Sequence, residues 1–258
     1  MRILSVTSGY PNKINRVKKI FAHEQNLEFS NRGYNVEVIN LGAESTVNEP
    51  EIYEGIPVIK FSKTGNNILK VLKLKKLLGN LLKNKKYDLV VFNGLAANQY
   101  FFLNCFKKRA TNTVVIVHGT DGMVDKSFLK NYLRRKFLSK VNLIFPVSNY
   151  TDTLVAHLEH RTNAMAQKSS VVCNGVNVNK FSSVIEKTKE EIRRELKIPE
   201  DKFVILTVCD LIERKGVDIL LKALGEFSKY NIDFLHIIIG RGNQSLALNN
   251  YAEELGIN

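Results

Sequence analysis

Residues 205–224 read ILTVCDLIERKGVDILLKAL and contain the three patterns that decide the fold class. The apolar run Val204–Val208 is typical of a buried strand, and apolar positions within residues 217–224 recur at the spacing of one helix face. A short loop with two cations and a glycine joins them. A strand, a loop and an amphipathic helix in this order predict one half of a parallel βαβ unit.

The same alternation of apolar runs and helical patterns extends over the rest of the chain. Strands are expected at 3–6, 36–39, 58–61, 89–92, 114–117, 143–146, 171–173, 203–208 and 234–239, and helices at 17–32, 68–86, 95–108, 126–140, 149–161, 185–196, 217–230 and 245–255. Apolar strands separated by helices indicate a parallel sheet that is covered on both faces. We therefore expect an α/β fold of the doubly wound type.

A domain boundary is expected at residues 174–187, NGVNVNKFSSVIEK, which are rich in Asn and Ser. It separates a complete domain at residues 1–176 from a second domain at 177–258. Only two βα units follow the boundary, so the second domain is expected to be truncated.

The charge of the chain is uneven. The formal net charge is +13, and residues 1–140 hold 24 Lys+Arg against 10 Asp+Glu. The helix expected at 68–86 has leucines on one face and lysines on the other, and Lys126, Lys130 and Arg134 form a second basic stripe. Such helices fit anionic lipid headgroups, so an anionic membrane surface is the expected partner. Nucleic acid is not expected because aromatic residues do not interleave with the basic ones, although a basic nucleic-acid-binding protein stays an alternative.

The location follows from what the sequence lacks. No apolar run approaches 18 residues, and the first residues are interrupted by Gly9 and Pro11 too early for a signal peptide. The three cysteines lie in or beside apolar stretches and are expected to be buried, reduced thiols. We expect a cytoplasmic protein, with peripheral attachment to the inner face of the membrane.

Three loops directly follow expected strands, at the edge where parallel sheets bind ligands. They are HGTDG at 118–122, DLIERKG at 210–216 and GRGN at 240–243. If the strands before the last two loops are neighbours and parallel, both loops lie on one edge of the sheet.

The second loop places Arg214, Lys215 and Gly216 at a helix N-terminus, where the helix dipole disfavours cations. The third loop contributes Gly240, Arg241 and Gly242. Backbone N–H groups together with cations bind phosphate, so an anionic ligand would make this arrangement favourable. A solvated pair of cations on a surface turn is the alternative.

His118 follows a buried strand and precedes a glycine, with Asp121 placed to orient it or to cap a helix. A hydrogen-bonded structural histidine is the alternative to a functional one. No second His or Cys offers metal-ligand spacing, and GRGN lacks the third glycine of a dinucleotide motif. Neither a metal nor a cofactor is expected.

Five segments together resemble glycosyltransferase family 4. They are ILSVTSGYPNKINRVKKIFAHEQNLEFSNRGYNVEVI at 3–39, VVIVHGTDG at 114–122, VCNGVNVNKF at 172–181, the 205–224 segment and IIIGRGNQSLALNNYAEELGI at 237–257. The similarity runs over the whole chain with the motifs in the right order, which is more specific than any single motif.

The resemblance implies a GT-B fold, in which two Rossmann-like domains face each other across a cleft. It implies retaining transfer of a hexose from a nucleotide-sugar on the second domain to a glycan or lipid-linked acceptor on the first, as in polysaccharide biosynthesis. By position, Lys215 would hold the donor diphosphate, the 240–242 loop would approach the nucleotide, and His118 would contact the transferring sugar. Gly9 and Tyr10 would form the acceptor-side loop.

Three departures from the family pattern bear on activity. Asp210 stands where the family usually has Arg, so that Arg214 would have to substitute. The glycine-rich loop after the first strand is reduced to Gly9, and residues 15–19 read NRVKK. The family's Glu-x7-Glu segment lies beyond Asn258. A catalytically incomplete fragment, or a non-catalytic acceptor-binding module, is therefore the main alternative to an active enzyme.

Overall fold

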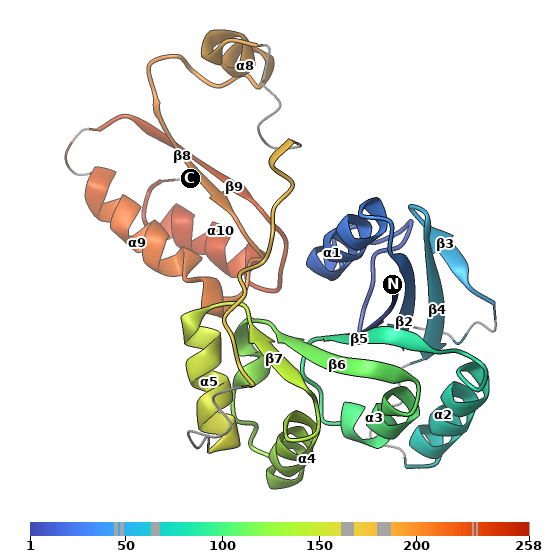
Figure 1. The fold of residues 1–258 in the computed structure, drawn as a ribbon. Helices are drawn as coiled ribbons and strands as arrows, with labels where there is room; N and C mark the ends of the chain where they lie inside the picture. Colours follow the sequence, from blue (N-terminus) through green and yellow to red (C-terminus); the bar gives the residue numbers. More distant parts are fainter. Residues whose placement is uncertain are drawn as a thin grey trace. The chain divides into compact units, whose positions relative to one another are not determined.

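The computed structural model describes residues 1–43, 46, 49–62, 68–160, 168–179, 187–228, 230 and 232–257. It divides into two compact units, Met1–Val178 and Asn179–Asn258 (Figure 1). Each unit is described by itself.

The first unit is built on a seven-stranded sheet in the order β3-β4-β2-β1-β5-β6-β7. Its strands are β1 Arg2–Thr7, β2 Asn35–Ala43, β3 Glu51–Tyr53, β4 Ile56–Ser62, β5 Tyr87–Asn93, β6 Ala110–Val117 and β7 Leu143–Pro146. Its helices are α1 Ile20–Asn31, α2 Ile68–Leu81, α3 Gln99–Lys107, α4 Phe128–Leu138 and α5 Asn149–Glu159, with a short 3-10 helix, η1, at Gly119–Gly122. All neighbouring strands are parallel except β3 and β4, so the doubly wound fold is confirmed with one antiparallel edge.

Helices cover the sheet of the first unit on both faces, as Figure 1 shows for α1 on one side and α2, α3 and α4 on the other. The larger core packs Leu74 and Leu78 of α2 and Phe102 and Phe106 of α3 against the strands. The smaller core includes Val36, Val38 and Val91, with α1 packed against it. Alternate residues of each strand thus enter different cores, as period-two geometry requires.

The edge hairpin was not predicted from the sequence. Glu54 and Gly55, both with positive φ (46° and 80°), join β3 to β4. Two successive positive-φ residues are the conformation of a tight hairpin turn, which Gly accepts readily. The signal was the dipeptide EG between two short apolar stretches.

Two other boundaries differ from the expected ones. Residues 171–173 form no strand; the chain there is extended, with Ser170 N and Val172 N donating to carbonyl groups of β7 at 3.0 and 2.9 Å. Helix α1 begins at Ile20 rather than at residue 17, because Lys19 before it has left-handed backbone angles (φ 53°, ψ 38°). A non-glycine residue in this conformation interrupts a right-handed helix.

The second unit holds a parallel pair of strands, β8 Phe203–Val208 and β9 Phe234–Ile239. Its helices are α8 Lys189–Glu195, α9 Val217–Ser228 and α10 Ser245–Glu254, with a 3-10 turn, η2, at Glu213–Lys215. Thr188 and Glu191 form a capping box at the start of α8. Residues 185 and 186, where this helix was expected to begin, lie outside the described part of the chain.

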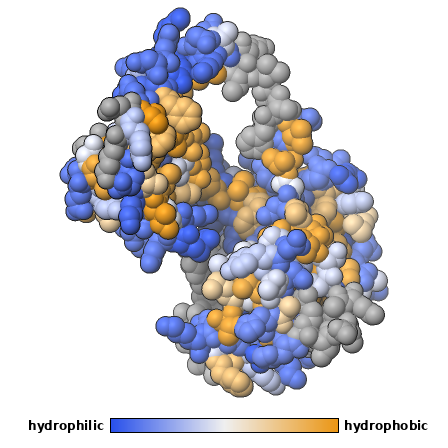
Figure 2. Space-filling view, turned by 90° about the vertical axis from the view of Figure 1, so that its left-hand side faces the viewer, coloured by the Kyte–Doolittle hydropathy of each residue, from blue (hydrophilic) through white to orange (hydrophobic). Residues whose placement is uncertain are grey.

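One face of the β8–β9 pair packs with α9 and α10 around Val217, Leu221 and Leu248. Leu206, Val208 and Ile239, on the opposite face, are more than half exposed. On the side of the molecule drawn in Figure 2, hydrophobic residues come to the surface in patches between hydrophilic ones. Parallel strands are normally covered on both faces. In the second unit only one face of the strand pair is covered, so its core is small.

The three cysteines differ in their exposure to solvent. Cys105 is buried, but Cys173 is exposed and Cys209 half-buried, so the expectation of three buried thiols was wrong. Cys173 is exposed because the segment around it runs outside the sheet.

Within the described residues, no helix is both long and apolar enough to cross a bilayer.

Candidate functional site

The HGTDG loop lies where β6 ends, at the carboxyl edge of the sheet. His118 has extended backbone angles, and its carbonyl oxygen accepts a hydrogen bond from Asp121 N at 2.9 Å. Gly119, with a φ of 47°, begins the 3-10 turn. The turn reverses the chain directly after the strand, so that His118 and Asp121 come from the same edge of the sheet.

The imidazole of His118 is enclosed but has no polar partner. Both ring nitrogens are shielded from solvent, and neither makes a hydrogen bond to any residue that the structure describes. The ring lies against Phe21, with centroids 4.0 Å apart. Burial, and secondly the nearby charge of Lys19, lower the pKa of His118 to about 4. The imidazole is therefore neutral at pH 7 and can exchange hydrogen bonds with a ligand.

Lys19 and Asp121 meet beside Gly94, which follows β5. Gly94 has a φ of 104°, and a side-chain β-carbon there would lie 3.2 Å from Asp121 Oδ2 and 3.9 Å from Lys19 Nζ. Asp121 Oδ2 is buried and makes no hydrogen bond within the described chain. A cation, a carboxylate and a neutral imidazole thus converge where β1, β5 and β6 end. Buried polar atoms without partners are rare in folded proteins, which marks this place as a candidate ligand site.

Sequence reasoning assigned no role to Lys19, Phe21 or Gly94. Lys19 stands in the loop after the first strand, and Gly94 directly follows β5, Tyr87–Asn93. The rule that ligands bind at the carboxyl ends of parallel strands could have indicated both positions. The left-handed conformation of Lys19 and the contact of Phe21 with His118 are visible only in the structure.

Tyr10 of the expected acceptor-side loop is buried, 2% exposed. Its hydroxyl bonds His23 Nδ1 at 2.9 Å and accepts from Asn26 Nδ2 at 3.3 Å, and His23 Nε2 lies 3.0 Å from a carboxylate oxygen of Glu54. Burial raises the pKa of Tyr10 above its ordinary value. The side chain of Tyr10 therefore supports the loop from beneath, and Gly9 brings the backbone close to the side chains of Lys18 and Lys19.

The two glycine-containing loops of the second unit pack directly on each other. Leu211 N donates to Arg241 O and Gln244 N donates to Leu211 O, both at 3.0 Å. A side chain at Gly240 would collide with the carbonyl oxygen of Cys209, and one at Gly242 with that of Leu211. These glycines are needed for close approach of the two loops, which lie on one edge because β8 and β9 are parallel.

Arg214 and Lys215 are exposed in the turn η2, directly before α9. Gly216 has a φ of 65° and ends the turn, and Lys215 N donates to Ile212 O at 2.9 Å. No ion pair joins either cation to another residue in the described ranges of the chain. The two side chains are therefore available to bind an anion. A pair of cations that is only solvated would have the same geometry.

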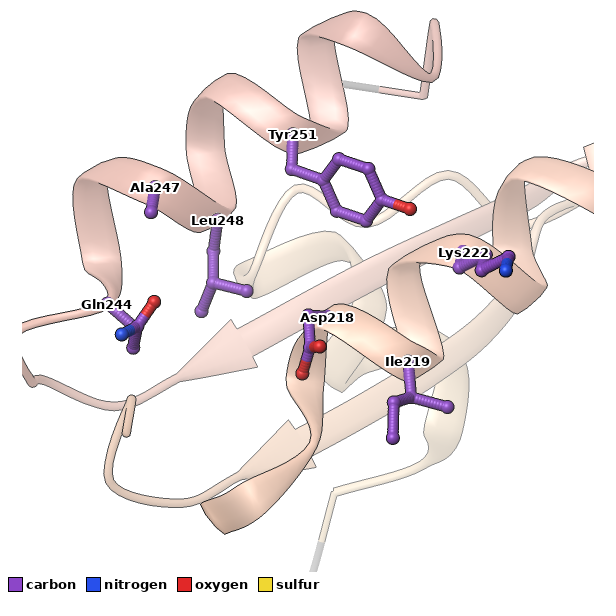
Figure 3. A pocket seen from close by; sticks show the side chains of 7 residues that line it. All are labelled: Asp218, Ile219, Lys222, Gln244, Ala247, Leu248 and Tyr251. Atoms are coloured by element: carbon purple, nitrogen blue, oxygen red, sulfur yellow. The ribbon is translucent and has the colours of Figure 1, made fainter. Parts of the chain in front are cut away.

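A pocket of about 490 Å³ lies between α9 and α10 in the second unit (Figure 3). Its walls are Asp218, Ile219, Lys222, Gln244, Ala247, Leu248 and Tyr251. Figure 3 shows Leu248 and Tyr251 of α10 opposite Asp218 and Lys222 of α9. Neither Arg214, Lys215 nor Arg241 lines it, and the carboxylate of Asp218 would repel a diphosphate. We therefore do not place the phosphate site in this pocket.

The described residues contain no cluster of three or more His, Cys, Asp or Glu side chains that could hold a metal ion. The candidate site in the first unit offers only one imidazole and one carboxylate, His118 and Asp121. The expectation that no metal or cofactor is needed stays a prediction.

A mostly parallel, doubly wound unit followed by a second unit with two βα repeats is the architecture of GT-B proteins. A glycosyltransferase from Rickettsia africae superimposes with a TM-score of 0.72 at 18% identity, over 98% of this chain and 64% of that one. Sucrose-phosphate synthase from Thermosynechococcus elongatus matches with a TM-score of 0.70 at 10% identity, over 100% and 69% of the two chains. HepE from Anabaena, in complex with UDP and glucose, matches with a TM-score of 0.65 at 17% identity, over 100% and 67%.

The sequence profile of Glycosyltransferase Family 4 matches residues 20–180, and that of glycosyl transferases group 1 matches residues 188–258. The chain belongs to glycosyltransferase family 4. It spans 64% of the length of the Rickettsia africae protein. No curated protein sequence matches it.

Proposed function

We propose that the protein is a retaining glycosyltransferase, which moves a hexose from a nucleotide-sugar to a glycan or lipid-linked acceptor at an anionic membrane surface. The observation that carries this proposal is the buried His118 imidazole, which has no hydrogen-bond partner among the described residues and lies near Lys19, in the same loop as Asp121. Membership of glycosyltransferase family 4 supports sugar transfer, and the UDP and glucose bound to HepE support the donor class.

The residues suit the charges of such a reaction. The bond between the anomeric carbon and the diphosphate breaks, and negative charge develops on the departing diphosphate. Arg214 and Lys215, with the helix N-terminus behind them, would stabilise that charge more in the transition state than in the ground state. The new bond forms to an acceptor oxygen, whose proton passes to the departing diphosphate. His118, neutral at pH 7, would hydrogen bond the transferring sugar rather than supply a charge.

The main alternative is a module that binds an acceptor without transferring sugar. It is favoured by one contrast: the first unit has an extensive core on both faces of its sheet, whereas the second has one covered face. Asp210, exposed in the place of the family's usual Arg, also weakens the donor side.

The test is transfer of labelled sugar from UDP-sugars and GDP-sugars into a bacterial lipid extract, with the anomeric configuration of the product read by NMR. His118→Ala should lower turnover while the melting temperature stays unchanged, and His157→Ala, at an exposed position, serves as the control. Normal turnover of His118→Ala would remove this residue from the mechanism, and its unfolding would make it structural. Binding of the lipid acceptor without any transfer would favour the alternative.

A further inference from the structure

Helix α4 exposes large apolar side chains at its N-terminal end and in the loop before it. These residues, here called the α4 apolar face, are Met123 (47% exposed), Val124 (46%), Phe128 (79%), Leu129 (64%) and Tyr132 (45%). They fall within residues 123–132, directly after the HGTDG loop. Single exposed apolar residues are normal on a protein surface, but five of them within ten residues, with Phe128, Leu129 and Tyr132 spaced along one side of α4, indicate an interaction site.

Hydrogen bonds of buried polar side chains hold the α4 apolar face outward. The side chain of Asn131 accepts from Asp125 N at 2.8 Å and donates to Asp125 O at 2.7 Å. Arg134 Nη1 donates to Met123 O at 2.7 Å. Asn131 and Arg134 are both buried, so this part of α4 turns polar residues inward and apolar residues outward. Arg134 is therefore not part of a surface stripe, contrary to the expectation from its spacing.

Exposed lysines surround the α4 apolar face. Lys126 and Lys136 are exposed, and Lys130, also exposed, pairs with Asp125 at 3.2 Å. Aromatic and aliphatic side chains flanked by lysines are the composition of segments that lie in the interface of an anionic bilayer. The charge complementarity argues for lipid rather than for an apolar surface of another protein.

The other basic helix of the unit cannot insert in the same way. Leu74 and Leu78 of α2 are buried in the larger core, whereas Lys73, Lys75 and Lys76 are exposed. Helix α2 therefore offers charge to a membrane but keeps its main apolar face inside. The lysine-rich helix expected at 68–86 can therefore contribute electrostatic attraction to a membrane, but not insertion of its leucines.

We propose that the α4 apolar face inserts into the headgroup region of an anionic bilayer, with Lys126 and Lys136 at the lipid phosphates. The inference rests on the proposed function, since it specifies how the protein meets the membrane that holds its acceptor. Insertion would hold the HGTDG loop at 118–122, which directly precedes Met123, at the bilayer surface. A lipid-linked acceptor would then present its headgroup where the candidate site lies.

The chain contains no tryptophan, so a single introduced one reports on its own surroundings. Phe128→Trp should show a blue-shifted emission with vesicles of phosphatidylglycerol and phosphatidylcholine, and much less shift with phosphatidylcholine alone. Leu72→Trp, at an exposed position of α2 (56%), is the matched control and should not shift. A shift of Leu72→Trp without one of Phe128→Trp would overturn the inference, while membrane binding as such would stand.

A second variant tests the energetic role of the face. Phe128→Ser together with Leu129→Ser should weaken binding to the anionic vesicles at least tenfold in co-sedimentation, with an unchanged melting temperature. Leu246→Ser, at a position of the second unit that is 73% exposed, should change binding less than twofold. Retained binding of the double variant would overturn the inference. It would also be overturned if the wild type forms a dimer and does not bind vesicles, and the double variant is a monomer. Sugar transfer to a soluble acceptor tests the proposed function separately from all these outcomes.

Discussion

At the scale of single residues, the glycines divide into those that the packing requires and those that it does not. Gly242 has no room for a β-carbon because the Leu211 carbonyl lies against it, whereas Gly79 of α2 has nothing within 4 Å. Gly242→Ala should destabilise the second unit by about 1–3 kcal/mol, the range for overpacking a tight contact. Gly79→Ala should be neutral or stabilising by about 0.5–1 kcal/mol, because alanine is the better helix former. Urea unfolding measures both, and equal effects would contradict the packing argument.

His118 makes stability depend on pH in a predictable direction. Its pKa falls from the model-peptide value of 6.5 to about 4 in the folded protein. Between these values the unfolded chain binds a proton that the native protein does not, so stability declines as the pH falls from 6.5 to about 4. Lys19 is the charged group whose proximity adds to the effect of burial on the His118 pKa.

His118→Gln should remove this dependence. With allowance for partial exposure of the residue, we expect the wild type to lose on the order of 2 kcal/mol more than the variant over that interval. Denaturant melts at several pH values measure the difference, with His157→Gln controlling for the loss of an exposed imidazole. Parallel pH profiles of wild type and His118→Gln would show that the ring is not shielded as the structure has it.

At the scale of elements, the turn η2 and helix α9 form the donor side of the proposed site. Arg214 and Lys215 lie next to the positive end of the α9 dipole without a described ion-pair partner. Lys215→Ala should therefore leave the free protein unchanged or stabilise it by about 0.3–1 kcal/mol. The same change should weaken binding of UDP or GDP, because a charge-assisted contact is worth about 1.5–3 kcal/mol.

Thermal melting with and without nucleotide separates these two effects. Lys222→Ala is the matched control, since Lys222 is an exposed cation of α9, the helix after η2, and lines the pocket of Figure 3. If Lys222→Ala weakens nucleotide binding and Lys215→Ala does not, the nucleotide occupies that pocket and our placement of the diphosphate is wrong. Destabilisation of the free protein by Lys215→Ala would instead indicate a structural role.

At the scale of the whole molecule, the two units should differ in stability. The first has buried residues on both faces of a seven-stranded sheet, and the second has two strands with Leu206, Val208 and Ile239 exposed on one face. Local stability follows the number of buried apolar contacts, so amide hydrogens of β8 and β9 should exchange at least tenfold faster than those of β1 and β5. Hydrogen exchange with mass spectrometry measures this by segment. Equal protection in β1 and β8 would contradict the prediction.

The sequence alone determined most of the elements and their order. Apolar runs predicted β1, β2 and β4 to β9 within a few residues. In the first unit the reason is that a strand covered on both faces has to be apolar along its length. The strands β8 and β9 carry the same pattern, although one of their faces is exposed. It also predicted that the loops after β8 and β9 would lie together, since this follows from parallel pairing alone. The family followed from motif order, which needs no coordinates.

Only the tertiary structure decided which residues of a helix are buried and which face solvent. Arg134 and Phe128 belong to one helix, yet the cation is buried against Met123 O while the aromatic ring is exposed, opposite to their hydropathy. The meeting of Lys19, Gly94 and Asp121 likewise joins three loops that are far apart in sequence. Strands and helices follow from local period and propensity, whereas burial and convergence depend on how distant segments pack, which no local pattern contains.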